Sequence, residues 1–183
     1  DTLYTCFDFS LAHFADRAPE LVDAIARLSE FTAAFLDWLA APALFGREKI
    51  FENDESQQGA FKDAAKLLHR LYDGGLLERE ILPISEDDNL TFYSLHPALR
   101  PFAAERLSEE AKTSAEDGYF LAMRHLGQRA YADFEKGGTL VLIVHRAVRD
   151  LVAASILRAD KDGSTLRFHT AWLLTVVGDL DGA

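Results

Sequence analysis

The sequence has very little cysteine and no long uninterrupted hydrophobic stretch. Its one cysteine, Cys6, permits no internal disulfide and favours a reducing compartment. No apolar run approaches the roughly 18 residues that a membrane-spanning helix requires. We therefore expect a soluble, cytoplasmic protein. Because no secretory leader is recognisable and the chain begins with Asp1, we expect it to be a piece of a longer protein.

Positive charge is also scarce. The chain carries 19 Lys and Arg against 30 Asp and Glu, a net charge of -11. Such a chain is repelled by phosphate backbones and anionic lipids, which argues against nucleic-acid or membrane binding. One row of cations, Lys62, Lys66 and Arg70, follows the polar face of a predicted helix at four-residue spacing. We interpret this row first as a solvated face and second as a docking patch for an acidic partner.

The short motifs that indicate catalysis or metal binding are missing. There is no G-x-x-x-x-G-K-[ST] loop for ATP and no H-E-x-x-H, and five of the six histidines are scattered without ligand spacing. The string from Asp160 to Gly163 is similar to the start of a calcium loop, but Ala171 stands where the twelfth position needs an acid. We therefore expect a non-catalytic chain with no metal site.

What the sequence does contain is a helix–hairpin–helix pattern in its centre. Apolar residues at helical spacing predict an amphipathic helix over 61–72, ended by Gly74-Gly75. Two β-prone runs, 76–84 and 90–95, flank a polar turn and predict a hairpin. His96-Pro97 then opens a helix to about 107, which Pro101 should kink or delay. This layout is that of a winged-helix domain.

The flanking regions are predicted to be helical. The expected helices are 1–14, 19–31, one beginning at 35, 119–134, 140–157 and 166–177, with 47–59 as a loop. The start of 140–157 is ambiguous between strand and helix, and the periodicity around Asp150 favours helix. A change in composition near 112 predicts two domains, 1–112 and 113–183. The last six residues, 178–183, resemble the inter-helix turn of tetratricopeptide-like repeats.

The central pattern resembles the winged-helix domain of STAND-type signalling ATPases, the NB-ARC proteins and related regulators. The resemblance covers Leu68, Leu71 and Gly75-Leu76-Leu77, then Tyr93-Ser94-Leu95-His96, then the stretch from Leu99 to Leu107. The region from Ser10 to Phe31 fits the family pattern loosely. The family's aspartate after the histidine is replaced here by Pro97. The resemblance implies a mainly α fold, with a winged-helix domain followed by a helical, tetratricopeptide-like arm.

The resemblance also implies a regulatory role. In the family, a histidine at the position of His96 reaches the β-phosphate of ADP on the neighbouring nucleotide-binding domain and holds the inactive state. We therefore expect a signal-transduction module that packs on its own ATP- or ADP-binding domain and links it to sensor repeats, with a possible homo-oligomer on activation. Two alternatives stay open. One is a winged-helix regulator that binds DNA through Lys62, Lys66 and Arg70, and the other is a stand-alone helical adaptor for protein partners.

Overall fold

The computed structural model describes residues 11–12, 14–15, 17–46, 50, 54–83, 89–138 and 140–181. The described chain is mainly helical with a small antiparallel sheet, as expected for the fold class. Its elements in chain order are α2 (Pro19–Leu28), β1 (Phe35–Leu36), α3 (Asp37–Phe45), α5 (Asp54–Asp73), β2 (Glu78–Pro83), β3 (Asn89–Ser94), α6 (Arg100–Ala104), α7 (Glu109–Phe134), α8 (Leu140–Ser155) and α9 (Lys161–Asp181).

The sheet has three strands in the order β1-β3-β2, and both pairings are antiparallel. The hairpin β2–β3 is confirmed, with Glu80 opposite Phe92. Strand β1 was not predicted, because Phe35 and Leu36 were assigned to a helix. That assignment is wrong: the two residues pair with Tyr93 and Phe92 along the free edge of β3. The pairing satisfies backbone groups that a helix start would have left open.

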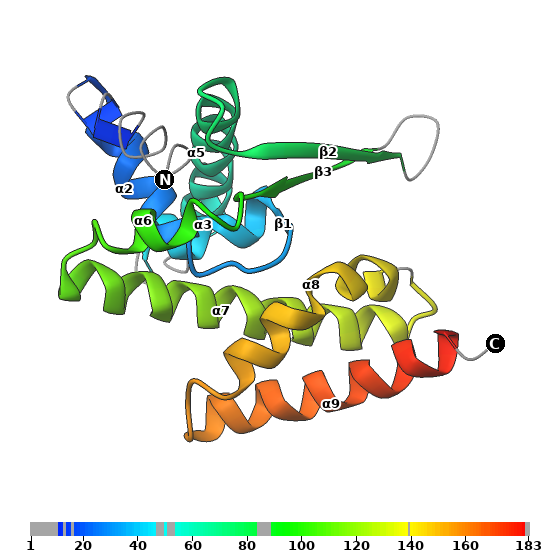
Figure 1. The fold of residues 1–183 in the computed structure, drawn as a ribbon. Helices are drawn as coiled ribbons and strands as arrows, with labels where there is room; N and C mark the ends of the chain where they lie inside the picture. Colours follow the sequence, from blue (N-terminus) through cyan, green and yellow to red (C-terminus); the bar gives the residue numbers. More distant parts are fainter. Residues whose placement is uncertain are drawn as a thin grey trace.

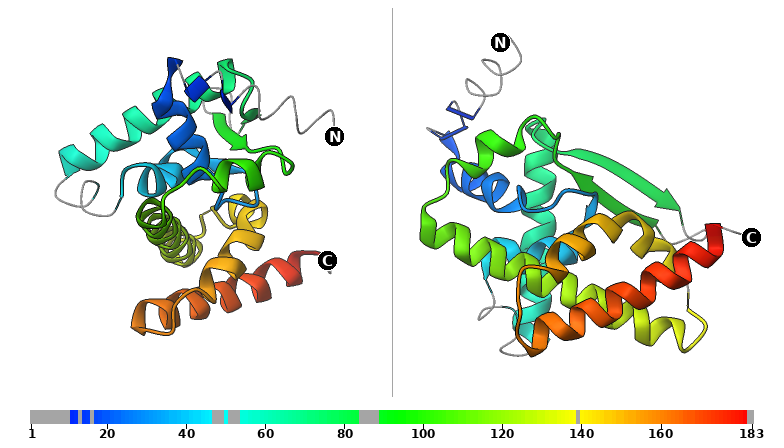
Figure 2. Two further views of the ribbon diagram at one scale, coloured as in Figure 1. Left: turned by 60° about the vertical axis from the view of Figure 1, so that its left-hand side comes forward. Right: turned by 60° about the horizontal axis from the view of Figure 1, so that its bottom comes forward.

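Helix α7 is the axis of the molecule. It packs against α3 on one side and against α8 and α9 on the other, as the ribbon shows (Figure 1). The contact with α3 is close because Gly118 has no side chain. A Cβ at this position would collide with the carbonyl group of Pro42 and with Ala43. The two further views show α9 on the outside of the layer formed by α7, α8 and α9 (Figure 2).

The apolar core is continuous across α7. Phe31 and Phe35 are fully buried between α2, the sheet and α7, with their ring centroids 4.6 Å apart. The ring of Tyr119, on α7, meets Phe31 edge-on at 5.1 Å. Leu151 and Leu173 extend the same cluster into α8 and α9. Burial of this apolar surface is the main driving force for the fold.

Several helix boundaries differ from the predictions. Helix α5 begins at Asp54, so the prediction of a loop over 47–59 is wrong for residues 54–59. Helix α7 begins at Glu109, ten residues earlier than predicted, because the Ser108 hydroxyl accepts a hydrogen bond from the Ala111 N–H and caps it. The boundary predicted near 112 therefore lies in the first turn of α7. The division into two domains stays a prediction.

The ends of the C-terminal helices also differ. Helix α8 is confirmed, and the strand alternative for its first residues is excluded. Helix α9 begins at Lys161, five residues earlier than predicted. It continues to Asp181, so the prediction of an inter-helix turn from residue 178 is wrong for residues 178–181. The helix predicted over 1–14 lies mostly outside the described residues. Within the described part of the chain, no helix combines the length and hydrophobicity needed to cross a membrane.

Candidate functional site

His96 lies at the joint between β3 and α6, on the surface. The prediction of a helix opened by His96-Pro97 is wrong in detail, because α6 begins only at Arg100. The delay expected from Pro101 is confirmed. A turn fills the gap, in which the Leu99 N–H donates to the His96 carbonyl at 2.9 Å. Three residues therefore separate the histidine from the helix that follows it.

The imidazole of His96 is exposed and oriented by a local hydrogen bond. The Ala98 N–H donates to its Nδ1 at 3.2 Å. A neutral ring that accepts at Nδ1 carries its proton on Nε2.

The predicted docking cations lie on a different element from His96. Lys62, Lys66 and Arg70 are all exposed on α5, as their spacing predicted. Two of the three are ion-paired within the chain. Lys66 Nζ lies 2.8 Å from Asp63, and an Arg70 amino group lies 2.7 Å from Glu20. The patch is therefore less positive than the sequence alone indicates.

Arg100, one turn beyond His96, connects this joint to the α2–β1 connection. One amino group donates to the carbonyl of Thr32 at 2.7 Å and, more weakly, to that of Leu95 at 3.4 Å. The Nε of Arg100 is buried and has no hydrogen-bond partner among the described residues. Burial lowers the pKa of the guanidinium, while the charge of nearby Asp150 opposes that shift.

Asp150 is the centre of a buried polar cluster. It is 1% exposed and projects from α8. Its Oδ1 accepts hydrogen bonds from the Thr32 N–H at 2.7 Å and the Thr32 hydroxyl at 2.6 Å, and its Oδ2 accepts from the Ala33 N–H at 3.0 Å. Such donors compensate the cost of removing a carboxylate from water.

Tyr119 closes the cluster from α7. Its hydroxyl lies 2.9 Å from the Asp150 carbonyl oxygen and 3.2 Å from the Asp150 Oδ1, so the two acceptors share one proton. Burial and then the charge of Asp150 raise the pKa of the phenol above its usual range. The hydroxyl therefore remains a donor at physiological pH.

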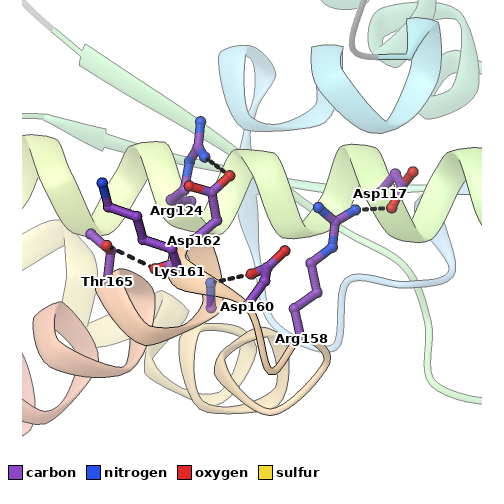
Figure 3. Close-up of polar contacts among 8 residues, drawn as sticks. Asp117, Arg124, Arg158, Asp160, Lys161, Asp162 and Thr165 are labelled. Carbon is purple, nitrogen blue, oxygen red and sulfur yellow. Dashed lines mark hydrogen bonds and ion pairs between the residues drawn. The ribbon is translucent and has the colours of Figure 1, made fainter.

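A second polar cluster surrounds the turn between α8 and α9 (Figure 3). Asp160 is used there as a helix cap: its carboxylate accepts from the Gly163 N–H at 2.9 Å. Ion pairs of Arg124 with Asp162 and of Arg158 with Asp117 fasten the turn to α7. Asp160 is thus engaged as a cap and Asp162 as an ion-pair partner. Within the described ranges, no group of three or more metal-binding side chains occurs.

A small apolar cleft lies between α3, α5 and α7. Trp38, Phe61 and His125 are among its lining residues, and its volume, including space open to solvent, is about 230 Å³. Burial lowers the pKa of His125. The enclosed part of the cleft has room for about one water molecule, which is too little for an organic ligand.

Comparisons with known proteins assign no relatives. No family model, no curated protein and no solved structure matches the chain. The functional argument therefore depends on the residues themselves.

The Asp150 cluster was missed by sequence reasoning. An acidic residue in a helix is normally read as exposed, and Thr32 and Tyr119 carry no motif. One signal was present in the sequence. Asp150 shares a helical face with Ala147, Leu151 and Ala154, all of which are buried. An acid within an apolar stripe indicates a buried, hydrogen-bonded carboxylate.

Proposed function

We propose that this chain is the winged-helix and helical-arm region of a cytoplasmic STAND-type signalling ATPase. In this proposal it is a non-catalytic module. It packs on the nucleotide-binding domain of its own protein while ADP is bound, and it passes a signal from downstream repeats. Activation releases that packing and favours assembly of several copies. The coupling is a two-state equilibrium in which contacts of the closed state compete with ligand binding elsewhere.

The order of the elements supports the winged-helix part of the proposal. A helix, a short strand, two helices and a hairpin follow one another, and the short strand joins the hairpin sheet. A helix followed by a hairpin and then by another helix is the layout of a winged-helix domain. Helices α7, α8 and α9 then supply the proposed arm.

The single observation that carries the regulatory part is the position of His96. It is exposed at a joint between two elements, and its Nδ1 is engaged by the Ala98 N–H. An oriented imidazole N–H is a suitable donor to a phosphate oxygen. The exposed position of the side chain and the orientation of its ring support the proposed contact with ADP.

The test uses the full-length protein that contains this chain. We expect its coding sequence to contain a G-x-x-x-x-G-K-[ST] loop upstream of Asp1. Replacement His96→Ala should then accelerate ADP release about tenfold, the effect of losing a hydrogen bond to a charged group of about 1.5 kcal/mol. Lys136→Ala, a change at an exposed residue with no assigned role, is the matched control. Absence of the loop, or equal ADP release from the His96 and Lys136 variants, would overturn the proposal.

A second candidate is a helical adaptor that binds a protein partner through α8 and α9. Large apolar side chains are exposed on these helices and in the turn between them, with Ile156 at 77%, Phe168 at 59% and Leu174 at 44%. Exposed apolar surface of this kind is a feature of protein-binding faces. Cross-linking of the full-length protein in its own cells tests this candidate. The Ile156→Asp/Phe168→Asp double variant should lose a cross-link to the partner that Glu105→Gln, a change at an exposed residue outside these helices, retains.

The DNA-binding alternative has less support. Two of its three proposed phosphate contacts, Lys66 and Arg70, are paired with carboxylates of the chain. A protein that uses such cations on phosphates binds duplex DNA with a strong dependence on salt. Retention of the chain on random duplex DNA at low salt would revive this alternative.

A further inference from the structure

The α2–β1 connection presents several hydrogen-bond donors to one carboxylate. The backbone N–H groups of Thr32 and Ala33 and the Thr32 hydroxyl all donate to Asp150, at distances between 2.6 and 3.0 Å. The Tyr119 hydroxyl adds a donor at 3.2 Å from Oδ1. Consecutive backbone N–H groups directed at one point form an anion-binding concavity. We name these donors of Thr32, Ala33 and Tyr119 the carboxylate cradle.

The occupant of the cradle comes from far along the chain. Asp150 lies 118 residues after Thr32 and belongs to the α8–α9 hairpin, residues 140–181. The cradle, apart from Tyr119, belongs to the sheet-bearing part, which we define as the described residues between 11 and 104. The carboxylate therefore holds one region of the molecule against the other as an internal ligand.

A second polar contact lies one helical turn away on the same face of α8. Arg146 forms two hydrogen bonds with Glu80 on β2, and its guanidinium lies 4.9 Å from the ring centroid of Phe92 on β3. Asp150 and Arg146 are four residues apart, so both face the sheet-bearing part together. Helix α8 thus contacts the sheet-bearing part through one carboxylate, that of Asp150, and one guanidinium, that of Arg146.

Polar attachment of this kind is specific and releasable. Donors and carboxylate exchange their mutual hydrogen bonds for bonds to water when they separate, whereas separated apolar surfaces gain no such compensation. A buried charge that is hydrogen-bonded to several donors adds little net stability, but it fixes the relative position of the groups that it joins. Removing one of the partners is strongly destabilising, because it leaves the other buried without compensation. The attachment is therefore expected to be either complete or broken.

We propose that Asp150 and the carboxylate cradle form a latch, whose opening lets the α8–α9 hairpin leave the sheet-bearing part as a unit. Arg100 extends the effect of the latch, since it donates both to the Thr32 carbonyl and to the Leu95 carbonyl next to His96. Opening of the latch therefore loosens the joint at residues 95–99. Every contact involved lies within this chain, so the proposal holds whether or not His96 meets a nucleotide.

Amide hydrogen exchange measured by mass spectrometry tests the latch. Asp150→Asn should accelerate exchange tenfold or more in three segments, 30–34, 95–99 and the hairpin 140–181, and leave α5 unchanged. Arg149→Gln, at the exposed neighbouring position, is the matched control and should behave as the wild type. Unchanged exchange in Asp150→Asn, or acceleration that is equal in α5, would overturn the proposal.

An empty cradle should also accept a small carboxylate from solution. In Asp150→Ala, rising formate should slow exchange at 30–34 back toward the wild-type rate, whereas chloride at equal ionic strength should not. Failure of formate to slow exchange in the folded variant would refute the cradle. If Asp150→Ala does not fold, Thr32→Ala and Tyr119→Phe replace it. They must show the same regional pattern of exchange, and equal exchange in all regions would refute the latch.

Discussion

The sheet-bearing part and the α8–α9 hairpin both pack on α7, but they differ in their exposed apolar surface and in their polar contacts. The first buries large rings such as Phe31 and Phe35 completely. The hairpin also contributes apolar residues to the common core, but it leaves Ile156 and Phe168 largely exposed. Besides this packing, ion pairs join the hairpin to α7 and to β2, and Asp150 joins it to the α2–β1 connection. Apolar burial thus stabilises both regions, while the polar contacts add specificity to the position of the hairpin.

The largest effect is expected from Phe31→Ala. The ring is fully buried and contacts both Phe35 and Tyr119. Loss of its packing should lower the free energy of unfolding by about 3–5 kcal/mol, measured by urea denaturation. The control is Phe134→Ala on α7, where the ring is 43% exposed and contacts Trp172. Equal losses in the two variants would contradict the comparison.

The next largest effect concerns the contact of α7 with α3. Gly118→Ala places a methyl group against the backbone of Pro42 and Ala43 and should cost about 1–3 kcal/mol of unfolding free energy. Gly59→Ala is the opposite case, because nothing lies within 4 Å of the added carbon. That variant should gain about 0.4–1 kcal/mol. Thermal unfolding distinguishes the two signs, and a stabilised Gly118→Ala would show that the helices are not in close contact.

A smaller effect is expected at the polar attachment. Tyr119→Phe removes the donor to Asp150 and leaves the ring against Phe31, so the loss should be about 1–2 kcal/mol. Tyr131→Phe on the same helix is the matched control. The Tyr131 ring contacts Trp172 at 4.8 Å, and its replacement should change the unfolding free energy by less than about 0.5 kcal/mol. If Tyr131→Phe cost as much, the Asp150 cluster would have no special role.

The smallest effect is a dependence on pH. Burial lowers the pKa of His125 and of His169, so the folded chain favours the neutral rings. The unfolded chain takes up protons near the usual pKa of 6.5, and the unfolding free energy should therefore fall as the pH drops below about that value. Burial raises the pKa of Glu30, which acts in the opposite direction at lower pH. Urea titrations between pH 7.5 and 5.5 should show a decline that His169→Gln reduces. If the unfolding free energy of that variant depended on pH as strongly as that of the wild type, His169 would be excluded as a cause of the decline.

The centre of the fold was predictable because its residues follow simple rules. Helix α5 has an apolar stripe at helical spacing, and Gly75, at a φ of +71°, ends it as predicted. The strand β1 was not predictable in the same way. A pair of apolar residues has no period, and it becomes a strand only because β3 offers a free edge. Tertiary contacts decided the structure at that position.

The polar cluster was harder to predict than the helices. The periodicity around Asp150 identified α8 correctly, but it did not indicate which residues would donate to the carboxylate. Thr32 lies more than a hundred residues away and has no local signal. His96 was selected from the family resemblance. It is exposed, and its function stays a prediction.

Native-state hydrogen exchange of the unmodified chain at low urea concentrations measures the contrast between the two regions most directly. If the hairpin is held by a releasable latch, amides of α8, α9 and residues 30–34 should exchange through one shared partial opening. The free energy of that opening should be lower than the free energy for α3 and α5. A single free energy for all of these segments, equal to that of global unfolding, would contradict the account.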